Sequence, residues 1–190
     1  MEYLKDTMDI LLIGIVVICA LFDLRSQIIP NVIVLPAILI FWGAHYAFDG
    51  MSGLNASMTG TGLAFLFFFI PYKLGVLGAG DVKLFMAVGA CLGPKGTVTT
   101  FLFTSLAGGL YALIVLIRHK NALRRFFNKL FGWAVVSLGT RKLNLFPEDA
   151  EYQMPMLCYG VAIAAGTLTT VMLSHLYPNL LILNILEGLS

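Results

Sequence analysis

The sequence predicts an all-α, polytopic membrane protein with about six transmembrane helices, and its composition and apolar runs carry that prediction. Of the 190 residues, 59% are hydrophobic and 12% are charged, and the mean hydropathy is +0.90. A water-soluble domain of this length needs polar outer faces on its helices, which most of the long apolar runs do not have. We therefore expect one membrane-embedded domain over residues 1–190, in contact with membrane lipids. The net charge of +2 indicates no nucleic-acid partner.

Six apolar runs, each bounded by charged residues, proline or glycine, are the predicted membrane helices. They cover residues 9–24, 30–48, 57–72, 82–92, 97–117 and 155–174. The fourth run is short, and it ends at Gly93 and Pro94, where a helix is expected to stop. The residues before the first run are acidic rather than basic, so we expect the first helix to be retained rather than removed as a signal peptide.

The distribution of lysine and arginine predicts the orientation in the membrane. With the N-terminus outside, ten of the twelve basic residues fall on the cytoplasmic side. These ten are Arg25, Lys73, Lys83, Arg118, Lys120, Arg124, Arg125, Lys129, Arg141 and Lys142, and the other two are Lys5 and Lys95. The predicted cytoplasmic segments are therefore 24–29, 73–81 and 118–154. The tail at 176–190 is then outside.

Residues 118–154 form the longest predicted segment between apolar runs. Within it, the sequence NALRRFFNKLFGWAVVSL mixes Arg124, Arg125 and Lys129 with aromatic and aliphatic residues. Such a mixture is typical of an amphipathic helix that lies in the membrane interface, here on the cytoplasmic side. A solvated linker with a few aromatic side chains is the alternative that the sequence leaves open.

Two acidic residues, Asp23 and Asp81, lie at the cytoplasmic ends of apolar runs. Ionisable groups at membrane depth are costly and are therefore candidates for function. Asp23 comes 14 residues after Asp9, and Asp81 comes 14 residues before Lys95, and both reference charges are predicted to lie outside. At about 1.5 Å per residue, the two aspartates are expected roughly 21 Å from the outer interface, at one depth, where they can face each other.

Two neighbouring carboxyl groups favour sharing one proton, so one can activate water while the other donates a proton to a carbonyl. This is aspartic-peptidase chemistry, and we predict Asp23 and Asp81 to be the catalytic pair. Asp81 is expected to open a helix, whose dipole favours a carboxylate, whereas Asp23 is expected near a helix end, where the dipole favours the neutral acid. Two alternatives stay open: neutralisation of the carboxylates by Arg25 and Lys83, and a small proton-coupled transporter or channel.

Three glycines, Gly75, Gly78 and Gly80, precede Asp81. Glycine allows close backbone approaches and positive φ values that other residues resist. We therefore expect this loop to present Asp81 to an extended substrate, and Gly80 to be needed for it. On the other motif, Pro30 and Asn31 are expected to set the start of the second helix.

The residues around both aspartates resemble the motifs of type IV prepilin peptidases, which are GxGD intramembrane aspartyl proteases. GAGDVK at 78–83 resembles the GxGDxK signature, and FDLRSQIIPN at 22–31 resembles the first aspartate motif of that family. A weaker resemblance covers MPMLCYGVAIAAG at 154–166. The resemblance implies that Asp23 and Asp81 are catalytic. The supporting or substrate-binding residues would be Gly78, Gly80, Lys83, Arg25, Pro30 and Asn31.

The resemblance also implies a function: cleavage of the leader peptide of prepilin-like substrates, after a glycine, at the cytoplasmic face of the inner membrane. Such substrates include type IV pilins, Flp/Tad pilins and preflagellins. Larger members of the family carry paired Cys-x-x-Cys motifs that are linked with N-methylation. Cys19, Cys91 and Cys158 have no such spacing, so the chain resembles the short form without the methyltransferase-associated domain. No metal and no cofactor are expected.

Overall fold

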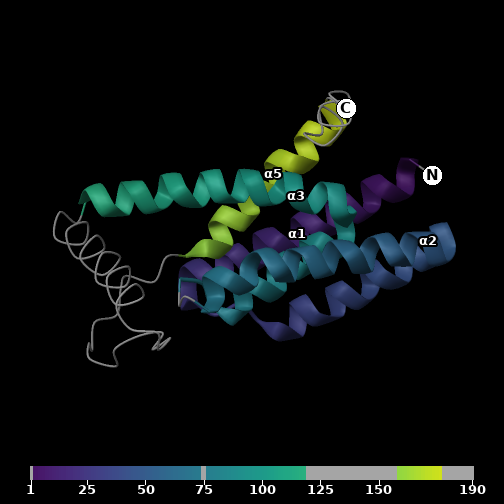
Figure 1. Ribbon diagram of the computed structural model, residues 1–190, viewed down its shortest axis with the longest axis horizontal. Helices are drawn as coiled ribbons and strands as arrows, with labels where there is room; N and C mark the ends of the chain where they lie inside the picture. Colours follow the sequence, from purple (N-terminus) through teal and green to yellow (C-terminus); the bar gives the residue numbers. More distant parts are fainter. Residues whose placement is uncertain (1, 74–75, 119–157, 177–190) are drawn as a thin grey trace, which may run out of the picture. The chain divides into compact units, whose positions relative to one another are not determined.

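The computed structural model describes residues 2–73, 76–118 and 158–176. All regular structure in these residues is helical: α1 (Glu2–Ser26), α2 (Asn31–Lys73), α3 (Ala79–Arg118) and α5 (Tyr159–Leu176) (Figure 1). The predicted all-α fold is therefore confirmed for this part of the chain. The predicted interfacial helix after residue 118 and the tail after residue 176 lie outside the described residues.

α2 is a helical hairpin rather than one continuous rod. Its 43 residues would extend about 65 Å if straight, roughly twice the hydrocarbon thickness of a bilayer. Gly50 interrupts the helix with φ 60°. Trp42 Nε1 donates a hydrogen bond of 3.0 Å to Thr61 Oγ1, although 19 residues separate them. The chain therefore folds back at Gly50, and the two halves of α2 run side by side (Figure 1).

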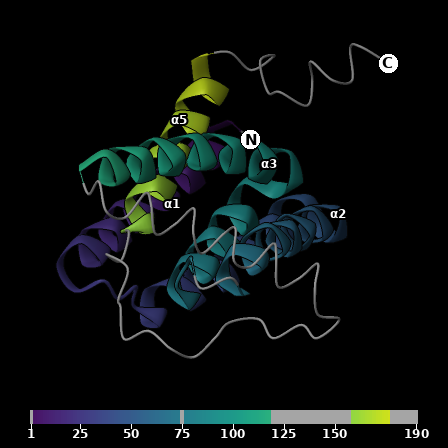
Figure 2. The same cartoon turned by 60° about the vertical axis from the view of Figure 1, so that its left-hand side comes forward.

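α3 folds back in the same way at Gly93, which has φ 67°. Pro94 follows, and proline suits the first position of the returning segment because it has no N–H to leave unpaired. The rings of Phe85 and Phe101 lie 6.4 Å apart across this hairpin. Figure 2 shows both hairpins from a second direction. The described residues thus contain six helical segments, and each overlaps one of the predicted apolar runs.

All four helices are long and apolar enough to cross a membrane. Their outer surfaces are apolar: Val32, Leu106 and Ile10 expose 83%, 71% and 70% of their surface. By contrast, Thr97 and Thr100 are fully buried. Apolar residues outside and hydroxyl groups inside are the arrangement that lipid favours. With the helix lengths, this identifies an integral membrane protein.

An aromatic cluster joins α2, α3 and α5 in the core. The rings of Phe68 and Phe85 stack with centroids 4.1 Å apart. The rings of Phe101 and Tyr159 meet Phe68 edge-on, at 6.2 Å and 5.9 Å. Stacked and edge-on pairs are the favourable aromatic geometries. Tyr159 is the first residue of α5, so the cluster holds the start of that helix against α2 and α3.

The chain divides into two compact units. The first comprises Met1–Gly108 and Cys158–Ser190, and the second comprises Gly109–Leu157, of which residues 109–118 are described. Within the first unit, α1 and α5 pack against each other. Every residue of the site described next belongs to this first unit.

Candidate active site

Asp81 lies in the first turn of α3, where its side chain caps the helix. Its Oδ2 accepts a hydrogen bond of 2.9 Å from the N–H of Gly78, whose carbonyl in turn accepts one of 3.2 Å from the N–H of Asp81. The side-chain bond is the N3-to-N-cap half of a capping box, and the carboxylate also faces the positive end of the helix dipole. The other carboxylate oxygen, Oδ1, is buried without a hydrogen-bond partner among the described residues. Capping therefore occupies one oxygen and leaves the second available.

Asp23 lies in the last turns of α1, and it is 6% exposed. α1 ends at Ser26, and the next residue, Gln27, has φ 53° and donates its N–H to the carbonyl of Asp23 at 2.9 Å. A residue of positive φ that closes such a bond is a typical helix C-terminal cap. The cap directs the chain away from α1 and leaves the Asp23 side chain inside the fold.

A helix far along the chain holds the carboxylate of Asp23. The N–H of Gly160, near the start of α5, donates a hydrogen bond of 2.9 Å to Asp23 Oδ2. The thiol of Cys158 lies 3.7 Å from the Asp23 carbonyl oxygen. A Cβ at position 160 would lie 2.9 Å from Asp23 Oδ2, so only glycine allows this approach without a shift. Gly160 satisfies one of its helix's unpaired N–H groups through Asp23.

A contact from α5 opposes the electrostatic difference that was expected between the two aspartates. Asp23 does lie near the end of α1, but its carboxylate receives an N–H group from the start of α5. Asp81 lies at the start of α3. Both carboxylates therefore accept an N–H group at the start of a helix, while Asp23 also lies near the C-terminal end of α1.

The structure brings Asp23 and Asp81 together. The close approach of Gly80 to Ile29 and the hydrogen bond from Lys83 to Asn31 join the segments that carry the two carboxyl groups. Asp23 and Asp81 are 6% and 8% exposed. The site is thus a pair of buried carboxyl groups contributed by α1 and α3.

Gly80 packs against the loop between α1 and α2. It lies inside the first turn of α3 and does not have a positive φ, which among the described glycines only Gly50 and Gly93 have. A Cβ at position 80 would lie 2.9 Å from Cβ of Ile29, which is itself buried. Glycine is therefore needed here for a close approach, not for a left-handed backbone. This contact packs the two aspartate motifs against each other.

A second contact joins the same two motifs. Lys83 Nζ donates a hydrogen bond of 3.0 Å to Asn31 Oδ1, which ties α3 to the first residue of α2. Pro30 helps to start that helix, because its carbonyl accepts the N–H groups of Ile33 and Val34. The sequence grouped Lys83, Asn31 and Pro30 as supporting residues, and the structure places them beside one another at this junction.

Arg25 is exposed, and neither Arg25 nor Lys83 forms an ion pair with Asp23 or Asp81. The alternative in which these two cations neutralise the aspartates is therefore wrong. The third glycine before Asp81, Gly75, and residues 154–157 of the weak third motif lie outside the described residues.

Three contacts of the site were not predicted: Gly160 and Cys158 on Asp23, and Ile29 on Gly80. The weak resemblance at 154–166 was the one signal that pointed toward Gly160. In the described ranges, His, Cys, Asp and Glu residues do not form a cluster of three or more that could hold a metal ion.

Asp9, which the sequence predicts to lie outside, is buried against another helix. The residue is 4% exposed, and its Oδ2 lies 3.2 Å from Nε2 of His175 on α5. On α2, His45 Nε2 lies 2.9 Å from the carbonyl oxygen of Cys91. Cys91 in turn lies 3.7 Å from the Met8 carbonyl oxygen. These contacts form a second polar group, at the end of α1 away from Asp23.

Comparison with known proteins decides the family. The profile of the protein family described as the Type IV leader peptidase family matches residues 10–113, more than half of the chain and including both aspartate motifs. This chain belongs to the type IV leader peptidase family. The match ends before α5, so Cys158 and Gly160 lie beyond it.

The chain is also similar to the prepilin leader peptidase/N-methyltransferase of Bacillus subtilis (strain 168). It is 30% identical to this chain over 118 residues, which are 61% of this chain and 47% of the relative. The chain thus spans about half the length of the relative that it matches. No solved structure matches the chain.

Proposed function

We propose that this protein is an aspartic endopeptidase that removes the leader peptide of prepilin-like substrates. The observation that carries the proposal is the pair of buried carboxyl groups, Asp23 and Asp81, each held by one backbone N–H group on a single oxygen. The family membership and the name of the Bacillus relative support the substrate class. Type IV pilins, Flp/Tad pilins and preflagellins are the candidates within that class.

The proposed chemistry divides acid and base roles between the two side chains. One carboxylate removes a proton from a water molecule, whose oxygen attacks the scissile carbonyl carbon, while the other carboxyl group protonates the carbonyl oxygen. Collapse of the tetrahedral intermediate breaks the C–N bond: the carboxyl group that took the proton from water gives it to the leaving nitrogen, and the other carboxylate takes back the proton from the intermediate's hydroxyl group. The unpartnered Oδ1 of Asp81 is the oxygen that we assign to contact the water or the shared proton.

The supporting residues act through the placement of these carboxylates. Gly78 holds Asp81 through a hydrogen bond, and Gly80 lets Ile29 approach. Lys83 and Asn31 join α3 to the start of α2. We therefore assign Gly78, Gly80, Lys83, Pro30 and Asn31 to holding the two aspartate motifs together. For the exposed Arg25 we propose contact with lipid headgroups or with the substrate.

For the membrane arrangement we propose six crossings of the bacterial inner membrane, one for each helical segment. The N-terminus lies outside and the Asp23–Asp81 pair faces the cytoplasm. The excess of lysine and arginine on one side supports this orientation. The segment from 79 to 92 is about 21 Å long, which is shorter than the roughly 30 Å hydrocarbon core of a bilayer. We therefore propose that the bilayer is thinner around this segment or that the segment stops before the outer interface.

The proposal is tested with purified protein in detergent or liposomes and a prepilin-like protein encoded in the same genome. Wild-type protein is expected to release the leader, and sequencing of the product's N-terminus identifies the bond. Asp23→Asn and Asp81→Asn should each abolish cleavage while the protein stays folded and inserted. Asp49→Asn, which changes an exposed carboxylate at the α2 hairpin, is the matched control and should cleave normally.

Substantial cleavage by either aspartate variant would remove the catalytic assignment. A proton-coupled transporter or channel would instead cause liposomes to take up protons in the absence of any peptide, and this uptake would require both aspartates. No acidic, basic or histidine residue lies between Asp9 and Asp23 on α1. This gap of about 21 Å speaks against a proton relay along that helix.

A further inference from the structure

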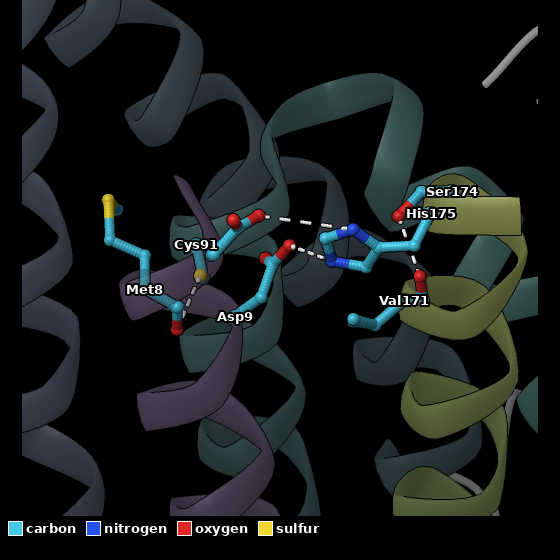
Figure 3. Close-up of polar contacts among 7 residues, drawn as sticks. Met8, Asp9, Cys91, Val171, Ser174 and His175 are labelled. Atoms are coloured by element: carbon cyan, nitrogen blue, oxygen red, sulfur yellow. Dashed lines mark hydrogen bonds and ion pairs between the residues drawn. The ribbon is translucent and has the colours of Figure 1, made fainter. Parts of the chain in front are cut away.

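The second polar group of the molecule, around Asp9 and His175, has no part in the proposed chemistry. Figure 3 shows the Asp9 carboxylate of α1 pointing at the imidazole of His175 on α5. The Asp9 Oδ2 to His175 Nε2 distance is 3.2 Å, and the other ring nitrogen, Nδ1, lies 3.9 Å from Asp6 Oδ1. The two acids are one helical turn apart, so both face the same ring.

This pair contains a buried carboxyl group. Asp9 is 4% exposed, and its Oδ2 has no hydrogen-bond partner among the described residues, so the imidazole is the group that faces it. Lys5, one turn earlier on α1, also attracts the Asp9 carboxylate. A buried carboxylate that loses its partner is destabilising, because the remaining charge is neither solvated nor paired. The contact between α1 and α5 at this end is therefore specific in position.

The same two helices are tied a second time, at the candidate active site. There, Gly160 of α5 donates its N–H to Asp23 of α1. Asp9 and Asp23 are 14 residues apart on α1, and Gly160 and His175 are 15 residues apart on α5. At about 1.5 Å per residue, the two ties are about 21 Å and 22 Å apart along two antiparallel helices. The spacings match, so both ties are made in one register.

We propose that Asp9 and His175 are positioning residues: their ion pair fixes the register of α1 against α5 and thereby holds Asp23 on the Gly160 amide. A slide of α5 by one residue is about 1.5 Å, which is enough to break the 2.9 Å hydrogen bond between Gly160 and Asp23. The pair thus acts on the catalytic carboxylate from the opposite end of its helix. This inference rests on the proposed function for its effect on cleavage, but not for its effect on structure.

The structural effect is measured on Cys158, which lies at the start of α5 with its thiol 3.7 Å from the Asp23 carbonyl oxygen. Of the three cysteines, Cys19 and Cys91 are buried and Cys158 is partly exposed. The rate at which N-ethylmaleimide modifies Cys158 at one fixed pH, read by mass spectrometry of its peptide, reports how tightly α5 sits on α1. This readout needs no peptidase activity.

We expect Asp9→Asn and His175→Gln each to speed modification of Cys158 about two- to fivefold, as loss of a partly exposed ion pair implies. Both variants should also lower kcat at least tenfold with little change in KM, because the carboxylate moves while substrate contacts remain. The exchanged pair, Asp9→His with His175→Asp, should return both readouts toward wild type. Asp49→Asn, an exposed carboxylate outside this pair, should change neither.

The outcomes separate this inference from the proposed function. A folded Asp9→Asn protein with wild-type Cys158 reactivity overturns the positioning role, whether or not the protein is a peptidase. Faster modification together with no cleavage even by wild-type protein supports the register tie and counts against the peptidase proposal alone. If Asp9→Asn does not accumulate in the membrane, the exchanged pair decides: restored accumulation and reactivity support the tie, and failure to restore them overturns it.

Discussion

Gly80→Ala is predicted to inactivate the protein without unfolding it. The added Cβ would lie 2.9 Å from Cβ of Ile29. Carbon atoms in contact rest about 3.5–4.0 Å apart, so α3 or the loop that carries Ile29 must move by roughly 0.6–1 Å. The atom that it meets is close to the backbone rather than at the end of a flexible side chain. The strain therefore moves the motifs that carry Asp81 and Asp23.

The effects of this substitution on stability and on activity should differ in size. Overpacking costs about 1–3 kcal/mol, while alanine gains about 1 kcal/mol over glycine as a helix former. The net loss of unfolding free energy is thus about 0–2 kcal/mol. A displacement of about 1 Å at a catalytic group can reduce the rate roughly 100-fold. We expect Gly80→Ala to be inserted and folded, with kcat lowered on the order of 10- to 100-fold.

The assay is cleavage of a prepilin-like substrate, with rates normalised to the amount of membrane-inserted protein. Thermal unfolding in detergent checks the fold. Gly62→Ala is the matched control, because Gly62 is also helical and has no atom within 4 Å of the added Cβ. Wild-type cleavage by folded Gly80→Ala would refute the idea that close packing of the two motifs positions the carboxylates.

Three further predictions address the cap, the tie and the orientation. Asp81→Asn keeps an oxygen for the capping hydrogen bond, so this variant should lose cleavage but not stability. Asp81→Ala should lose cleavage and also about 1 kcal/mol of unfolding free energy, measured by thermal unfolding. Equal stability of the two variants would contradict the capping role. Gly160→Ala should reduce cleavage at least about tenfold, because its Cβ would lie 2.9 Å from a catalytic oxygen, while Gly14→Ala, in open space, should not. A cysteine at Ser26 should react with an impermeant thiol reagent from the cytoplasm and one at Ser52 from outside; the reverse pattern would overturn the orientation.

The meeting of Asp23 and Asp81 could be expected from the sequence because a helix has a fixed rise per residue. Equal spacing of 14 residues from two charges that are predicted to lie on one side predicts both acids at one level. The hairpin breaks at Gly50 and Gly93 have a similarly local cause, because glycine tolerates positive φ. Such features depend on residues close in sequence.

The partners of the acids could not be predicted, because they depend on which helices meet. Gly160 holds Asp23 across 137 positions, and no periodicity in the sequence marks that contact. The contact between Asp9 and His175 was not predicted for the same reason, because the two residues lie on different helices. The role of Gly80 was attributed to a positive φ or to substrate access, whereas its close neighbour is Ile29 from the other motif.

The hydrogen bond from Gly160 to Asp23 forms only after the C-terminal part of the chain has been synthesised. The ribosome completes α1 and the first turn of α3 before it reaches Gly160, which comes 79 residues after Asp81. At about 5–20 residues per second, both carboxyl groups exist in the growing chain for roughly 4–16 s before the amide that holds Asp23 is made. A chain still under translation therefore carries both acids in the bilayer without their final geometry. On the proposed function, proteolysis begins only when the last described helix has joined the first.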